Sequence, residues 1–132
     1  MTQSITLRKI EQIRNEQMDP NILKTLENRN RGKSFFCEHR SDELTSLCPI
    51  TRLPDFYSIH LIYEPHEKLI ELKSLKYYLH SFRSDELYHE EFTNQIFDDL
   101  KGIIEPKWIF ICLKAKVRGG IDTTVKRYWK KN

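Results

Sequence analysis

The chain has 132 residues, which is enough for one ordinary domain and too few for two independent cores. Apolar residues make up 39% of the chain and charged residues 31%, a lean composition for a globular domain that favours burial of apolar surface between subunits. The formal net charge of +3 is too small to indicate nucleic-acid binding by itself.

The N-terminal third carries few structural signals. Short helices are possible at Ile5–Ile13 and after Asp19, which can cap a helix that starts at Pro20. The first residues contain no apolar signal region, and no apolar run approaches the roughly 20 residues that span a bilayer. We expect residues 1–33 to form a peripheral arm, residues 34–132 to form the domain, and the protein to be cytoplasmic with no membrane contact.

The middle of the chain predicts two strands and a helix. Residues Phe56–Tyr63 alternate between two sets of mostly aromatic and β-branched side chains, a pattern typical of a strand. Residues 64–67 predict a turn, and Lys68–Leu72 resumes an extended pattern. Residues Lys73–Phe82 then present an apolar face at helical spacing.

The last third predicts a long helix and two further strands. His89–Ile104 has apolar residues at intervals of four, and Pro106 follows as a stop signal. Trp108–Val117 predicts a strand, and Ile121–Tyr128 a strand that returns beside it. The order strand, strand, helix, helix, strand, strand predicts an α+β domain with an antiparallel sheet, whose edges another subunit can extend.

The three cysteines favour a reducing compartment. Cys37, Cys48 and Cys112 form no closely spaced pair, and one is left over in any disulfide scheme. Their spacing with His39 and His89 matches no compact zinc pattern, so we expect no metal.

Two residues around a Pro-rich turn are candidates for catalysis. Cys48 is followed by Pro49 in a turn, so it is either an inert buried thiol or a nucleophile that needs a lowered pKa or an acid–base partner. Asp55 opens the first predicted strand and is either a solvated turn residue or an acid whose pKa is raised by burial.

Three further groups are open to two interpretations each. His89 and Glu90 open the long helix, where a carboxylate suits the helix dipole, while a buried carboxylate can also clamp the N–H edge of a guanine-like ring with two hydrogen bonds. Lys73 and Lys76 share a helix face that is either solvated or able to hold phosphates. The break at residues 118–120 is either a bulge or a close approach of backbone to a ligand.

In combination, these segments resemble a known family. Leu44–Thr51, followed by Pro54-Asp55-Phe56, is similar to the nucleophile segment of the NADPH-dependent 7-cyano-7-deazaguanine reductases, the QueF family. Glu71–Tyr78 resembles that family's eight-residue signature. The segments that follow in the family's order are Ser81-Phe82-Arg83, His89-Glu90 and Arg118-Gly119-Gly120-Ile121.

The resemblance implies a fold and an assembly. The fold is the tunnelling fold (T-fold), an antiparallel sheet with two helices whose copies join edge to edge into a multi-subunit barrel. Single-domain members are expected to be homo-oligomers of two stacked rings, with active sites at subunit interfaces.

The resemblance also implies a reaction. The Cys48 thiolate attacks the nitrile of 7-cyano-7-deazaguanine to give a thioimide, Asp55 acts as general acid, and NADPH supplies hydrides to form 7-aminomethyl-7-deazaguanine, a queuosine precursor. Glu90 holds the deazaguanine edge, with His89 beside the reacting group. The remaining implied residues are Glu71 and Ser74 for the substrate, and Lys73, Lys76, Arg83, Arg118 and Gly119 for NADPH.

Two departures and two rival hypotheses accompany the resemblance. Thr51-Arg52-Leu53 stands where many relatives have Thr-Gly-Gln, and Glu43-Leu44 stands where many have Glu-Phe. One rival is an amidine-forming relative that makes archaeosine on tRNA. It needs no nicotinamide site, so the retained Glu71–Tyr78 signature argues against this rival. The basic C-terminal tail and Arg52 favour it, because a tRNA substrate needs phosphate contacts. The other rival is a non-catalytic T-fold binding module.

Overall fold

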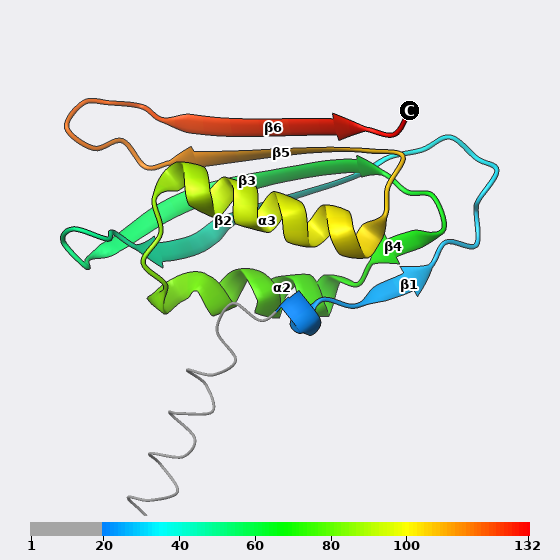
Figure 1. Cartoon of the computed structure of the whole chain (residues 1–132), viewed down its shortest axis with the longest axis horizontal. Helices are drawn as coiled ribbons and strands as arrows, with labels where there is room; N and C mark the ends of the chain where they lie inside the picture. The colour runs from blue at the N-terminus through cyan, green and yellow to red at the C-terminus, as the bar shows by residue number, and fades with distance from the viewer. Residues whose placement is uncertain (1–19) are drawn as a thin grey trace, which may run out of the picture.

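The computed structural model describes residues 20–132, which form a four-stranded antiparallel sheet with two α-helices on one face (Figure 1). The strand order is β2-β3-β5-β6, and a separate two-stranded sheet pairs β1 with β4. The elements are η1 (Pro20–Ile22), β1 (Thr25–Glu27), β2 (Cys37–Leu47), β3 (Pro54–Glu64), β4 (Lys68–Ile70), α2 (Leu72–His80), η2 (Ser81–Ser84), α3 (His89–Ile104), β5 (Trp108–Ala115) and β6 (Thr124–Lys130). The predicted α+β class is confirmed. The predicted helix at Ile5–Ile13 and the Asp19 cap lie outside the described residues.

Strand β3 is the central ladder of the sheet. It pairs antiparallel with β2 on one side and with β5 on the other. Its odd-numbered residues, from Asp55 to Tyr63, face the helices and are buried, while its even-numbered residues face the open side of the sheet. The period-two pattern of the sequence predicts this strand correctly.

Strand β2 has no counterpart among the predicted elements. Its sequence, Cys-Glu-His-Arg-Ser-Asp-Glu-Leu-Thr-Ser-Leu, contains almost no apolar alternation, because it is an edge strand whose residues are mostly half-buried or exposed. Only Leu44 and Ser46 of this strand are fully buried. A register irregularity between Ser41 and Leu44 obscures the period further.

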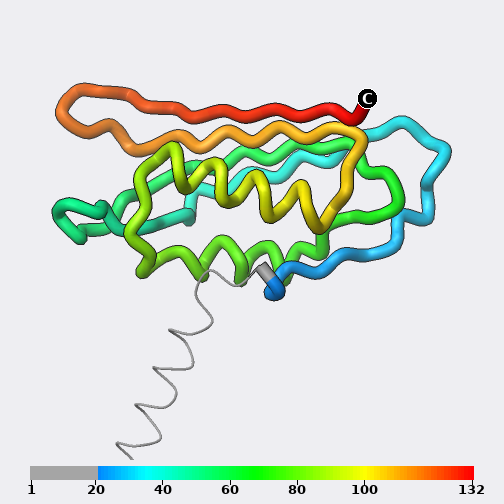
Figure 2. Tube along the Cα trace, in the orientation of Figure 1, coloured from blue at the N-terminus to red at the C-terminus, as the bar shows by residue number. Residues whose placement is uncertain are grey.

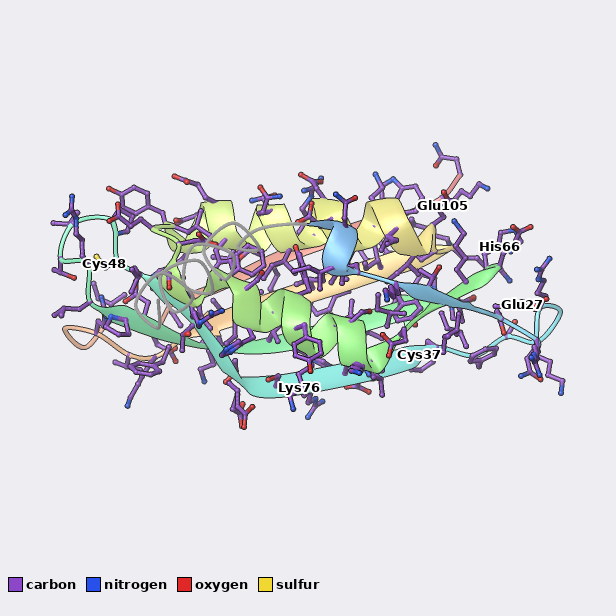
Figure 3. The ribbon with its side chains drawn as sticks, turned by 90° about the horizontal axis from the view of Figure 1, so that it is seen from below. Glu27, Cys37, Cys48, His66, Lys76 and Glu105 are labelled. Atoms are coloured by element: carbon purple, nitrogen blue, oxygen red, sulfur yellow. The ribbon has the colours of Figure 1, made fainter. Side chains whose placement is uncertain are left out.

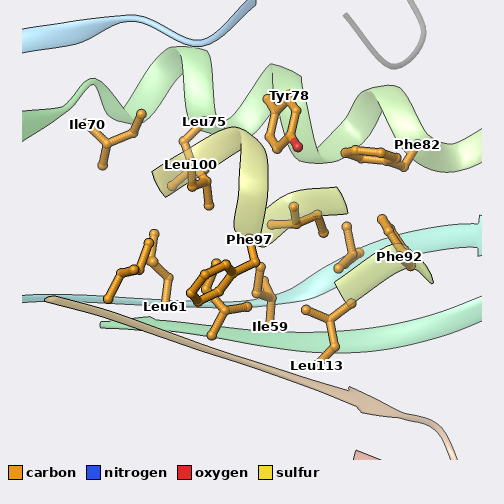
Figure 4. Close-up of a cluster of buried hydrophobic side chains, with 14 of the residues drawn as sticks. Ile59, Leu61, Ile70, Leu75, Tyr78, Phe82, Phe92, Phe97, Leu100 and Leu113 are labelled. Carbon is orange, nitrogen blue, oxygen red and sulfur yellow. The ribbon is translucent and has the colours of Figure 1, made fainter. Parts of the chain in front are cut away.

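The two helices begin and end at residues with a physical reason to be there. The Glu71 side chain caps α2 by accepting hydrogen bonds from the backbone N–H groups of Lys73 and Ser74, at 3.1 and 2.7 Å. Helix α3 spans the predicted His89–Ile104 and ends at Glu105 in the left-handed conformation. Together the helices cover the sheet with apolar side chains from both, shown with their sheet partners in Figure 4.

The predicted arm includes residues that pack on the domain. Leu23 belongs to the hydrophobic core, and Thr25–Glu27 pairs with β4 as strand β1. Asn28 is buried and donates from its side chain to the His66 carbonyl at 2.8 Å. Residues 23–28 therefore contact the body of the domain. The boundary at residue 33 stays a prediction.

The chain reverses direction repeatedly at one end of the molecule. The 48–53 loop between β2 and β3 and the 116–123 connection between β5 and β6 both lie at this end, as does the start of α3 (Figure 2). In the described part of the chain, no helix has the length and apolar character needed to cross a membrane.

Because α3 contributes buried side chains to the core, truncating one of them should strongly lower the free energy of unfolding. Leu100 is fully buried between the sheet and α2 (Figure 4), so Leu100→Ala should lower the free energy of unfolding by about 2–5 kcal/mol, through lost burial and a residual cavity. Urea denaturation followed by far-UV circular dichroism measures this. Glu91→Ala, at an exposed position of the same helix, should change it by less than about 1 kcal/mol. Equal effects of the two substitutions would contradict the assigned packing.

Candidate active site

The predicted catalytic residues converge on one end of the sheet. Cys48 lies in the loop after β2, Asp55 is the second residue of β3, and His89 is the first residue of α3. Figure 3 shows Cys48 at one end of the molecule, with Lys76 of α2 nearer the middle and His66 at the opposite end. Residues separated by up to 41 positions in the sequence are thus brought to a single edge of the fold.

The loop that carries Cys48 is held by its own backbone. The Cys48 N–H donates to the Leu53 carbonyl at 2.9 Å, and the Arg52 N–H donates to the Cys48 carbonyl at 2.8 Å. Arg52 adopts the left-handed conformation, with φ of 59°, which is strained for a residue other than glycine. Its guanidinium lies 3.2 Å from a Glu86 carboxylate oxygen, which ties the loop to the segment before α3.

The Cys48 thiol is activated by local hydrogen bonds. The Thr51 hydroxyl and the backbone N–H groups of Thr51 and Ile50 lower its pKa below the ordinary thiol value, while the nearby Asp55 carboxyl opposes them. The thiol is half-buried and unpaired. A thiolate is the nucleophilic form, so this environment favours reactivity over the inert alternative.

Asp55 is buried beside an arginine from the opposite hairpin. The residue is 4% exposed, and its carboxylate forms an ion pair with Arg118. The same guanidinium donates to the Pro54 carbonyl at 3.1 Å. Arg118, expected to face cofactor phosphates, is thus engaged with the predicted acid within this chain. Burial excludes the solvated-turn interpretation of Asp55.

The break in the chain after Arg118 is a hairpin turn. Gly119 and Gly120 have φ values of 55° and 75°, and the flanking Arg118 and Ile121 exchange backbone hydrogen bonds. Two consecutive positive φ values are the requirement of a tight two-residue turn. The glycines are therefore explained by the turn that brings Arg118 to Asp55.

The start of α3 presents one anchored and one exposed side chain. The His89 Nδ1 lies 2.6 Å from the Tyr57 hydroxyl, and the two rings meet edge-on with centroids 5.3 Å apart. Burial raises the pKa of Tyr57 to about 12. Glu90 is exposed in the first turn rather than buried, and the helix dipole there favours its negative charge.

The signature residues of α2 form a second group. Glu71 caps the helix, and the Ser74 hydroxyl accepts from the Lys24 N–H at 3.0 Å and donates to the Glu71 carbonyl at 2.7 Å. Glu71 lies at the start of a nine-residue helix, about 13 Å along its axis from the end nearer Cys48. Within the chain, these two residues are not brought to Cys48.

Cationic side chains accompany this second group. Lys73 and Lys76 are exposed on α2, while Arg83 donates to the His80 carbonyl at 3.1 Å in the turn that follows. A hollow of about 320 Å³ lies at the start of the helix, lined by Ile22, Lys24, Glu71, Lys73, Ser74 and Tyr77. Lys24 and Tyr77 were not among the predicted site residues. Lys24 has no local signal, because only the packing of residues 20–27 on α2 brings it there.

The three cysteines are far apart or face different ways. Cys37 begins β2 and Cys48 directly follows its end, so the two are about 35 Å apart for an extended strand (Figure 3). Cys112 lies on β5 opposite His60, on the open face of the sheet. Within the chain, Cys37 therefore cannot bridge to Cys48. Among the described residues, no three His, Cys, Asp or Glu side chains gather as a metal site.

Several known proteins are similar to this chain. A family model described as "QueF-like protein" matches residues 54–132. A protein of Chloroherpeton thalassium is 45% identical over 108 residues, which are 82% of this chain and 93% of that protein. A protein of Alkalilimnicola ehrlichii is 47% identical over 103 residues, 78% of this chain and 80% of its own length. Both relatives are named NADPH-dependent 7-cyano-7-deazaguanine reductase.

A solved structure shares the fold. The crystal structure titled archaeosine synthase QueF-Like, in the apo form, matches with a TM-score of 0.63 and 21% identity, over 72% of this chain and 91% of that one. At this identity the likeness concerns the fold alone, and it confirms the predicted antiparallel sheet with two helices of the T-fold.

The environment of Cys48 predicts a pH-dependent change in thiol reactivity. Thr51→Val removes the hydroxyl that contributes most to lowering the pKa of Cys48, so that pKa should rise. The thiolate fraction at neutral pH then falls, and the rate of iodoacetamide labelling should drop and shift its midpoint to higher pH. Peptide mass spectrometry, which resolves Cys48 from Cys37 and Cys112, measures the rate. Thr51→Ser keeps a hydroxyl and should label like the unchanged protein; a Thr51→Val curve that overlays both would contradict the account.

Proposed function

This chain belongs to the QueF-like protein family, and we propose that it reduces the nitrile of 7-cyano-7-deazaguanine to the aminomethyl group of 7-aminomethyl-7-deazaguanine with NADPH. The names of its relatives supply the substrate and the cofactor. The observation that carries the proposal is a thiol with lowered pKa, Cys48, close enough to a buried carboxyl, Asp55, for the two to interact.

The proposed chemistry begins at Cys48. Its thiolate attacks the electrophilic nitrile carbon, a C–S bond forms, and one π bond of the nitrile breaks with its electrons moving to nitrogen. The Asp55 carboxylate takes the proton that the Cys48 thiol releases and gives it to that nitrogen as general acid, which completes a neutral thioimide. Arg118, already paired with the Asp55 carboxyl, stabilises the carboxylate that remains.

The later steps need hydrides and further protons. NADPH, when bound, supplies the hydrides that take the nitrile carbon to the amine level. The Cys48 thiolate leaves as the carbon–nitrogen double bond of the imine forms. His89 lies beside the reacting group and moves protons to the nitrogen, and the exposed Glu90 carboxylate accepts from the N–H edge of the deazaguanine.

The cofactor site is proposed on α2. Lys73 and Lys76 are exposed and one turn apart, and Lys24 joins Lys73 around the adjacent hollow. Cations of this kind suit the phosphates, and the 54%-exposed Tyr77 ring offers a flat apolar face for a base. These side chains therefore fit the charged and aromatic parts of NADPH.

We also propose that the complete site forms between subunits. Cys48 and the signature residues Glu71 and Ser74 belong to different parts of one chain, so those of one subunit would serve the Cys48 of another. In the four-stranded sheet of the described residues, strands β2 and β6 are edges that a neighbouring copy can extend. The proposed assembly is a barrel of two stacked rings. A cytoplasmic location is proposed as well, since all three cysteines are unpaired.

The nucleophile can be tested by turnover. Purified protein with 7-cyano-7-deazaguanine should oxidise NADPH, seen as loss of absorbance at about 340 nm, and Cys48→Ala should abolish this because no thioimide forms. Cys112→Ala, which removes a thiol on the open face of the sheet, should retain turnover. Equal activity of Cys48→Ala and the unchanged protein would exclude the mechanism. No NADPH oxidation, with amidine formation when ammonia and nitrile-bearing tRNA are supplied, would instead assign the amidine-forming reaction.

The cofactor site can be tested by kinetics. Lys73→Ala and Lys76→Ala should each raise KM for NADPH by about tenfold, which corresponds to one lost charge-assisted contact of about 1.4 kcal/mol, with kcat little changed. Steady-state rates against NADPH concentration measure both constants. Lys107→Ala, an exposed lysine beside β5, is the matched control and should leave KM unchanged. A fall in kcat alone would contradict a role in binding phosphates.

A further inference from the structure

The helix that carries His89 packs its first residue against a buried tyrosine. The Tyr57 hydroxyl oxygen and the His89 Nδ1 are 2.6 Å apart, a short distance for a hydrogen bond of this kind. The Tyr57 ring is fixed independently by an edge-on contact with Phe92, at 5.1 Å between centroids. Tyr57 is fully enclosed, so its hydroxyl has few partners besides His89.

A second buried hydroxyl lies on the other side of Tyr57. Ser46, on β2, is 0% exposed and is the cross-strand partner of Asp55. Its Oγ makes no hydrogen bond of regular geometry to any described residue, yet it lies close enough to the phenol to offset part of the effect of burial on the pKa of Tyr57. A buried hydroxyl needs a partner, and the Tyr57 oxygen is available to it as an acceptor.

These contacts give the hydrogen bonds a direction. A neutral imidazole nitrogen is a better acceptor than a hydroxyl oxygen, and a phenol that stays protonated is a good donor. With this direction, Tyr57 donates to the His89 Nδ1, and the Tyr57 oxygen is left to accept from the nearby Ser46. An imidazole that accepts at Nδ1 must carry its proton on Nε2.

We propose that Tyr57 is a positioning residue that holds His89 in the Nε2–H tautomer, and so presents a proton at the ring nitrogen farther from Tyr57. This inference rests on the proposed function of His89 as a proton-carrying group in nitrile reduction. Tyr57 itself touches neither substrate nor cofactor and acts only through the histidine. It would act as a group that hydrogen-bonds to one ring nitrogen of a histidine and so sets which nitrogen carries the proton.

The surroundings of Tyr57 keep this arrangement intact. Besides His89, the charged or titratable groups that act on Tyr57 are Asp55 and Arg118, which pair with each other, and the Cys48 thiol. Burial keeps the phenol neutral throughout the neutral range, because it raises the pKa of Tyr57 to about 12. The donor to His89 is therefore present at every pH at which the protein would work.

Tyr57→Phe tests the inference, because it removes the hydroxyl and keeps the ring and its contact with Phe92. Solid-state ¹⁵N spectra of protein labelled in its histidines distinguish protonated from unprotonated ring nitrogens, with His89→Asn assigning the resonances. We expect His89 to be protonated on Nε2 in the unchanged protein and to become a mixture of tautomers in Tyr57→Phe. Turnover should show kcat lower by about tenfold with KM for NADPH unchanged. Ser46→Ala should produce a smaller change of the same kind.

Tyr63→Phe is the matched control on the same strand. Its hydroxyl accepts the Ile70 N–H at 2.9 Å, remote from His89, so it should change neither the tautomer nor kcat. A Nδ1–H tautomer in the unchanged protein, or a spectrum that Tyr57→Phe leaves unaltered, would overturn the inference. The spectra need no turnover, so they decide it even if the nitrile proves not to be the substrate. Activity in the unchanged protein separately decides the proposed function.

Discussion

Along β3, side chains alternate between the helix-covered face and the open face of the sheet, and this alternation places Asp55 and Tyr57 on the same side as the apolar core. A one-residue slip of the register would carry both to the open face. The pairing of β3 with two neighbours prevents such a slip. The same ladder fixes where β2 ends, and hence where the Cys48 loop begins.

At the polar end of the core, the buried Asp55 carboxyl has a compensating cation beside it, Arg118. A carboxyl as enclosed as Asp55 would be costly alone, and the paired Arg118 offsets that cost. The Gly119-Gly120 turn is what delivers the arginine, so the β5–β6 hairpin belongs to the site as much as the Cys48 loop does. The thiol, in turn, is activated by backbone and hydroxyl donors within its own loop and needs no distant cation.

Local periodicity accounts for what the sequence could predict. The alternation of β3 and the i+4 stripe of α3 come from one face being buried, and both elements were found with nearly correct limits. Strand β2 was not predicted, because an edge strand with polar side chains lacks a regular apolar pattern. The motifs located Cys48 and Asp55, but no local signal indicates the contacts of Asp55 with Arg118 or of Tyr57 with His89, which depend on strand register and helix packing. For Glu71 the sequence cannot separate two roles, because a helix cap and a ligand contact both need a carboxylate at this position.

The central claim is that this end of the sheet captures a nitrile on Cys48. Intact-protein mass spectrometry after incubation with 7-cyano-7-deazaguanine, without NADPH, tests it most directly. The account predicts a mass increase equal to one molecule of the nitrile per chain, mapped to Cys48 by peptide analysis and absent from Cys48→Ala. An unchanged mass, or an adduct on Cys37 or Cys112 in its place, would contradict it.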